Sequence, residues 1–187
     1  MVTNQEKEKV FNALVENGIE FLSSSVGELD SRPKFSVAHF STGLELLLKA
    51  RLFAEHWALV AANPHGASWP QLTGGTLQTI QASKLCDTIE TVVGIPLTSQ
   101  RKVFQSVFRH RNRILHFMPV EDPVEIAGEQ LRAWFHLYGL LRGNWRQVFA
   151  EYQATFKGLD ELLRSNRKYL KAVFEEKGSL INGLAAE

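Results

Sequence analysis

The segment RHRNRILH, from Arg109 to His116, brings three arginines, two histidines and one asparagine together within eight residues. No aspartate or glutamate occurs between Glu90 and Glu121, and Arg101 and Lys102 add two cations to this acid-free stretch. Because the whole chain has a formal net charge of only +1, this is the one segment clearly suited to bind an anion. An imidazole can move protons near neutral pH, and a guanidinium can hold phosphate oxygens in a planar fork. The residue types therefore predict acid–base chemistry on a phosphate group.

Helical spacing divides these residues between two sides of one helix. At about 100° per residue, four polar residues share one side: Arg109, Asn112, Arg113 and His116. Arg111 falls on the opposite, apolar stripe, where an unpaired guanidinium would cost several kcal/mol or so. Three arrangements remain open. The stripe faces a second subunit across a wet cleft, Arg111 bonds an internal carboxylate such as Glu45, or the helix distorts so that both groups reach one pocket. The second arrangement gives Arg111 a structural role.

Apolar residues recur at helical intervals along most of the chain, and capping, proline and glycine signals divide it into helices. The expected ranges are 4–24, 33–62, 77–93 and 99–117, then a long helix after a turn bracketed by Pro119 and Pro123, which can continue to 156, and a segment over 159–174. The range 33–62 is apolar on more than one side, which is typical of a central helix. Between 63 and 75 we expect a long irregular connection, suited to a lid or specificity loop.

No strict alternation over the length of a strand and no fixed repeat occurs in the sequence. The pattern predicts an all-α fold, an antiparallel bundle of five or six helices, in a single domain over 1–187. Residues from about 142 to 187 are expected to form a helical extension, which either completes the bundle or serves as a docking arm.

Composition excludes several classes of site. The single cysteine, Cys86, can form no disulfide within the chain and offers no set of metal ligands, so we expect no metal and no cofactor. One cysteine and a polar start without a signal core fit a reducing, cytoplasmic setting. The longest apolar runs are far too short to span a bilayer, which predicts no membrane association.

Two segments resemble the HEPN superfamily. Arg111-Asn112-Arg113-Ile114-Leu115-His116 matches its Arg-polar-x3-His signature, in the form with asparagine in the polar place. The stretch from Ala38 to Ala50 is similar to the long central helix of the family, and the resemblance covers about 4–141. Arg109 also satisfies a looser spacing with His110 in the polar place, so two registers remain, of which we prefer Arg111 because asparagine follows it.

The resemblance implies a HEPN-like bundle and a metal-independent endoribonuclease, built as a homodimer in which the two motifs meet in a composite active site. It also implies a toxin or antiviral defence effector, with RNA as substrate and an antitoxin or defence protein as partner. Some relatives carry a tyrosine just after the motif histidine, where the partner modifies it, but Phe117 and Met118 stand there in this chain. Other members are non-catalytic modules that bind a partner protein or a nucleotide, and this remains the alternative. The third hypothesis is a basic patch that binds DNA and RNA equally.

The expected roles follow from the chemistry of RNA, whose 2′-hydroxyl is its own nucleophile. His116 serves as base or acid, Arg111 stabilises the crowded phosphorane, and Asn112 orients the phosphate or the histidine. Five further residues are expected to hold flanking phosphates: Arg101, Lys102, Arg109, His110 and Arg113. Glu45 either pairs with Lys49 on its own helix or orients Arg111 from behind.

The remaining histidines and tryptophans have simpler explanations. His39 and His56 lack the cysteine, aspartate or glutamate neighbours that a metal site needs, so we interpret them as core or surface residues. Trp134 and Trp145 lie at helical spacing and are expected in the core. Trp69 lies in the irregular connection and is the tryptophan best placed to stack on a base.

Overall fold

The computed structural model describes residues 2–116 and 123–166, together with residues 171, 175 and 178. These residues form seven α-helices and no β-strand, which confirms the all-α class, although only five or six helices were expected. The helices are α1 (Asn4–Glu28), α2 (Pro33–Glu55), α3 (Trp69–Thr73), α4 (Ala82–Val93), α5 (Thr98–Leu115), α6 (Pro123–Arg142) and α7 (Gln153–Arg164). Short 3-10 helices occur at Trp57–Val60, Pro64–Gly66 and Ala150–Tyr152.

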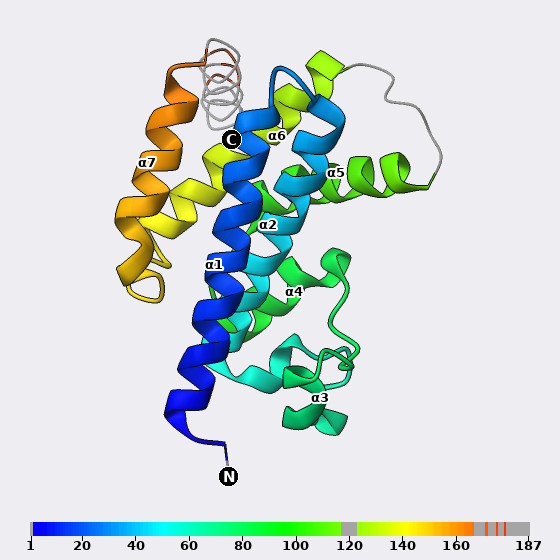
Figure 1. Ribbon diagram of the computed structural model, residues 1–187, viewed down its shortest axis with the longest axis vertical. Helices are drawn as coiled ribbons and strands as arrows, with labels where there is room; N and C mark the ends of the chain where they lie inside the picture. The colour runs from blue at the N-terminus through cyan, green and yellow to red at the C-terminus, as the bar shows by residue number, and fades with distance from the viewer. Residues whose placement is uncertain (1, 117–122, 167–170, 172–174, 176–177, 179–187) are drawn as a thin grey trace, which may run out of the picture.

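The long helices α1 and α2 form an antiparallel pair (Figure 1). The first begins at a capping box, in which Thr3 and Glu6 satisfy each other's backbone N–H groups. Where the two helices cross, a Cβ atom added to Gly43 would lie 2.8 Å from the carbonyl oxygen of Gly18 and 2.8 Å from Cγ of Leu22. Glycine at position 43 therefore allows the two backbones to approach closely.

Helix α5 crosses the α1–α2 pair, and its C-terminal end projects to the right edge of the molecule (Figure 1). Its apolar stripe is buried through four residues: Phe104, Val107, Phe108 and Ile114. Leu115, at the projecting end, keeps 57% of its surface exposed. The helix is thus anchored in the core along one stripe and exposes Asn112 and Leu115 of its last turn to solvent.

Helices α6 and α7 complete the same core. Trp134 and Trp145 are buried, as the sequence predicts, and Nε1 of Trp134 donates a hydrogen bond of 3.1 Å to Oδ1 of Asp160 on α7. Phe156 and Leu163 of α7 are also buried. The long helix expected after the proline-bracketed turn is α6, which ends at Arg142 and does not continue to residue 156, because residues 143–149 form turns. The predicted segment 159–174 lies partly outside the described residues.

The prediction that the second helix reaches residue 62 is wrong, because α2 ends at Glu55. His56 adopts an extended conformation, with φ −160° and ψ 132°, and its Nδ1 accepts a hydrogen bond of 3.3 Å from the N–H of Ala58. The chain continues as the 3-10 helix Trp57–Val60. A side chain that caps a new turn therefore stops a helix that apolar periodicity alone would extend.

The helix expected over 77–93 is α4, which begins at Ala82 rather than at residue 77. Ala61 and Thr79 form an isolated antiparallel bridge, and the N–H of Ile80 donates to the carbonyl of Val60 over 2.9 Å. These backbone bonds hold the residues before α4 in an extended conformation. The expected irregular connection over 63–75 contains the short helix α3.

Among the described helices, none has both the length and the apolar character needed to cross a membrane.

Candidate functional site

The sequence places its candidate residues on α5, which is a regular helix from Thr98 to Leu115. His116 is the C-cap, with φ −107° and ψ 36°, and its N–H donates to the carbonyl of Asn112 over 3.0 Å. The helix therefore does not distort at Arg111, which excludes the third of the three arrangements within this chain. Phe117, expected as the last helical residue, lies outside the described residues.

Arg111 bonds an internal carboxylate, which is the second of the three arrangements and the one that gives this guanidinium a structural role. Its Nη2 lies 2.8 Å from Oε2 of Glu45 on α2, and the two side chains are 26% and 19% exposed. The other oxygen of Glu45 accepts a hydrogen bond of 2.7 Å from Nζ of Lys49, which also donates to Oγ1 of Thr79 over 3.0 Å. Both roles considered for Glu45 are thus present at once, and one carboxylate bridges two cations.

This ion pair fixes the direction of the Arg111 side chain toward α2. Residues five positions apart on a regular helix point about 140° away from each other. Arg111 and His116 of one chain therefore lie on different sides of α5, and they meet at one phosphate only if Arg111 leaves Glu45 or a second copy supplies one of the groups.

The other side of α5 is open to solvent. Lys102, Arg109, Asn112 and His116 are exposed, and Arg113 is half-buried. Within the part of the chain that the structure describes, the first four make no side-chain hydrogen bond or ion pair. Their N–H groups are therefore available to a polyanion, and the residues share one face of the helix at spacings of three to seven positions.

Two of the expected phosphate ligands are held by carboxylates instead. Arg101 forms an ion pair with Asp87, at 2.9 Å, and with Glu90, both on α4. Nε2 of His110 pairs with Glu129 on α6, which also accepts a hydrogen bond of 2.9 Å from Ser106. The sequence carries no signal for these acids, because they come from neighbouring helices rather than from within the acid-free stretch.

His39 lies at a different surface, where α1 ends. Its Nδ1 lies 2.7 Å from Oε2 of Glu28, and Arg32 bonds the other oxygen of the same carboxylate. The hydrogen bond from Arg32, with a smaller contribution from His39, holds the pKa of the Glu28 carboxyl below its ordinary value despite partial burial. These contacts link α1 to α2 and give His39 a structural explanation, as expected.

Trp69 is half-buried rather than free to stack on a base. Its ring meets that of Trp57 edge to face, with centroids 5.4 Å apart, and lies 6.4 Å from the ring of Phe53. In the part of the chain that is described, no three His, Cys, Asp or Glu side chains are grouped so that they could hold a metal ion.

No family model, curated protein or solved structure matches this chain. The resemblance to the HEPN superfamily rests on the two sequence segments described above. In the structure these segments touch, because Glu45 of the first segment pairs with Arg111 of the second.

Proposed function

We propose that this protein is a metal-independent endoribonuclease of the HEPN type, acting as a toxin or antiviral defence effector. The observation that supports it most is the contact between the two family-like segments. Glu45 holds Arg111 by an ion pair of 2.8 Å, at the base of an exposed helix end where Asn112 and His116 have no described partner. An oriented guanidinium, a free imidazole and a free amide are the groups that this chemistry requires.

In the proposed reaction, His116 removes the proton from the 2′-hydroxyl of the RNA, and the resulting oxyanion attacks the adjacent phosphorus. Arg111 bonds the non-bridging oxygens and stabilises the negative charge of the phosphorane. The bond from phosphorus to the 5′-oxygen breaks, and that oxygen takes a proton from a second imidazole or from water. The products are a 2′,3′-cyclic phosphate and a 5′-hydroxyl.

The active site is composite and needs two copies of the chain. Because Arg111 and His116 of one copy point to different sides of α5, we expect the projecting ends of two α5 helices to face each other. Leu115, which is 57% exposed beside His116, supplies apolar surface for this contact. The two histidines of the homodimer can then divide the roles of base and acid.

The RNA strand is expected to follow the exposed face of α5. Lys102 and Arg109 offer exposed cations along this face to the flanking phosphates, and Arg113 is half-buried on the same face. Arg101 and His110 already have carboxylate partners, so we assign them a smaller share of the binding than the sequence suggested.

The test is digestion of RNA by the purified full chain in EDTA, with analysis of the product ends. His116→Ala is expected to reduce the rate by at least about a hundredfold, as is typical of losing a general base. His65→Ala is the matched control, because His65 is also exposed but lies in the 3-10 helix Pro64–Gly66, away from α5. Cleavage that depends on a divalent metal, or equal losses in both variants, would reject the proposal.

Arg111 needs a separate design because it also contributes to packing. Arg111→Lys keeps a positive charge opposite Glu45 but removes the planar fork. We expect this variant to keep its fold, measured by circular dichroism, and to lose most of the cleavage. A fully active Arg111→Lys variant would show that the guanidinium has no role in the reaction.

The Arg111–Glu45 ion pair also favours a second candidate, a non-catalytic helical module that binds a partner protein or a nucleotide. In that case the ion pair only stabilises the packing of α2 against α5. The purified homodimer would then cleave no RNA, and His116→Ala would leave partner binding unchanged. Growth arrest by the wild-type chain, but not by His116→Ala, separates the two candidates in cells.

A further inference from the structure

Glu45 on α2 lies between two cations that reach it from different elements. Its Oε1 accepts a hydrogen bond of 2.7 Å from Nζ of Lys49, and its Oε2 accepts one of 2.8 Å from Nη2 of Arg111 on α5. Within the described residues, neither cation has another carboxylate partner. Two positive charges and one negative charge therefore leave a surplus of one positive charge where α2 meets α5.

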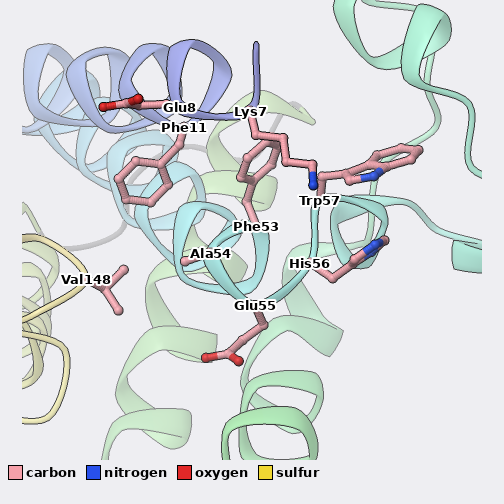
Figure 2. Close-up of a pocket in the computed structure, with 9 residues that line it drawn as sticks. All are labelled: Lys7, Glu8, Phe11, Phe53, Ala54, Glu55, His56, Trp57 and Val148. Atoms are coloured by element: carbon pink, nitrogen blue, oxygen red, sulfur yellow. The ribbon is translucent and has the colours of Figure 1, made fainter. Parts of the chain in front are cut away.

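The charges at the C-terminal end of the same helix are matched one to one. Glu55 pairs with Arg51 at 2.7 Å, and the side chain of Arg51 is only 6% exposed. Lys7 of α1 lines the same hollow of the surface as Glu55, but Figure 2 shows the Glu55 carboxylate directed away from the Lys7 side chain. The partly buried pair at this end therefore carries no surplus charge, in contrast to the arrangement at Glu45.

Lys49 is fixed in its place by two elements. It is only 9% exposed, and its ammonium also donates to Oγ1 of Thr79 over 3.0 Å. Thr79 is held in turn by its backbone bridge to Ala61. Removing a charge from water costs free energy, and one cation would already neutralise Glu45. The second cation is therefore not required by the packing of α2 against α5.

Arg111 keeps donors and exposed surface for an anion. Its hydrogen bond to Glu45 uses an N–H group of Nη2, whereas a guanidinium has five N–H groups in total. The side chain is 26% exposed, so a phosphate can reach it from solvent. If Arg111 alone were paired with Glu45, the two charges would cancel, and a phosphate would be attracted only weakly. Because Lys49 neutralises Glu45 from the buried side, the charge of Arg111 stays available.

We infer that Lys49 is a positioning residue of the proposed ribonuclease site, which neutralises Glu45 so that this carboxylate orients Arg111 without cancelling its charge. The inference rests on the proposed function, because it takes Arg111 as the ligand of the phosphate. Lys49 acts through Glu45 rather than on the RNA, since its side chain is 11% exposed and bonds Glu45 and Thr79.

The test is fluorescence anisotropy of the full chain with a labelled single-stranded oligodeoxyuridylate, which carries phosphates but no 2′-hydroxyl and is therefore not cleaved. Lys49→Met removes the positive charge beside Glu45 and is expected to weaken binding at least about threefold. Glu45→Gln removes the negative charge, while its amide oxygen can still accept the hydrogen bond of Arg111, and is expected to strengthen binding by a similar factor. Both variants lose the same ion pair, so a purely structural role would change both affinities in the same direction.

The double variant Glu45→Gln/Lys49→Met restores the surplus of one charge, and we expect its affinity to lie within about twofold of the wild type. Lys157→Met and Glu161→Gln are the matched controls, because these two residues form an ion pair of the same i,i+4 spacing on α7. They should leave the affinity unchanged, and thermal melting establishes that each variant is folded.

Four results would overturn the inference: shifts of the same sign or no shift for Lys49→Met and Glu45→Gln, a double variant that binds more weakly than Lys49→Met, equally large effects of the α7 controls, or no binding at about 1 mM oligonucleotide. Parallel digestion of RNA separates this inference from the proposed function. Opposite shifts without any cleavage by the wild type would reject the ribonuclease and keep the role of Lys49 in phosphate binding. Cleavage with shifts of the same sign would reject the role of Lys49 alone.

Discussion

Glu45 on α2 forms the ion pair that connects this helix to α5. It holds Lys49 at 2.7 Å and Arg111 at 2.8 Å, and all three side chains are less than a third exposed. Two partly buried cations that share one carboxylate leave an excess positive charge close to the protein surface. The charge of Glu45 therefore stabilises the fold. It also sets the position of Arg111, the side chain proposed to bind the phosphate.

We predict that Glu45→Gln lowers the free energy of unfolding by about 1–2 kcal/mol, because it leaves both cations without a counter-charge in a partly desolvated place. Urea denaturation at neutral pH measures this change. Glu161→Gln is the control, since Glu161 pairs with Lys157 on α7 but its side chain is 61% exposed. We expect the control to change stability by less than about 0.5 kcal/mol. Similar losses in the two variants would contradict a special role for Glu45.

At the scale of elements, the close approach of α1 and α2 sets the frame on which α5 rests. Gly43 and Gly18 lie at this crossing, and neither needs a positive φ. The requirement for glycine at 43 is therefore one of space between helices. Any side chain there meets the backbone of Gly18, which cannot move aside as a flexible side chain could.

Gly43→Ala is expected to destabilise the protein by about 1–3 kcal/mol, as overpacking of a well-filled contact usually does. Gly139→Ala on α6 is the matched helical control, because nothing lies within 4 Å of an added Cβ at that position. There the better helix propensity of alanine should stabilise the protein by up to about 1 kcal/mol. Thermal or urea unfolding should therefore show changes in the free energy of unfolding of opposite sign for the two variants. A Gly43→Ala variant as stable as the wild type would contradict the close contact.

At the scale of the whole molecule, one hydrophobic core connects α1 to α7, and Cys86 of α4 is part of it. The thiol is 2% exposed, and burial raises its pKa to about 12. Because a thiolate is the reactive form, the native protein should resist thiol reagents at neutral pH. As the single cysteine of the sequence, it reports the opening of this core without background from other thiols.

We predict that an aromatic disulfide reagent labels Cys86 in the native state at least about a hundredfold more slowly than in denaturant. The logarithm of the labelling rate should rise in Gly43→Ala in proportion to its loss of stability, because both report the same cooperative opening of the core. Rapid labelling of the wild type would show that α4 opens independently of the other helices.

The sequence by itself determined the helical class and most helix positions, because helical periodicity and caps are local. The capping box of Thr3 and Glu6 fixes the start of α1, and the spacing on α5 already separates Arg111 from the side that carries His116. The extension of the second helix past Glu55 could not be excluded locally, since residues 57–62 continue the apolar pattern. Its end depends on a cap at His56 and on the bridge between Ala61 and Thr79.

Only the tertiary structure decided which polar groups of α5 have partners. Arg111 and Glu45 are 66 positions apart, and spacing along the chain left three arrangements open for that guanidinium. Arg101 and His110 look as available as Arg109 in the sequence, yet carboxylates of α4 and α6 hold them. The physical reason is that an ion pair depends on the distance and burial of its atoms. Both are set by how the helices pack rather than by the order of the residues.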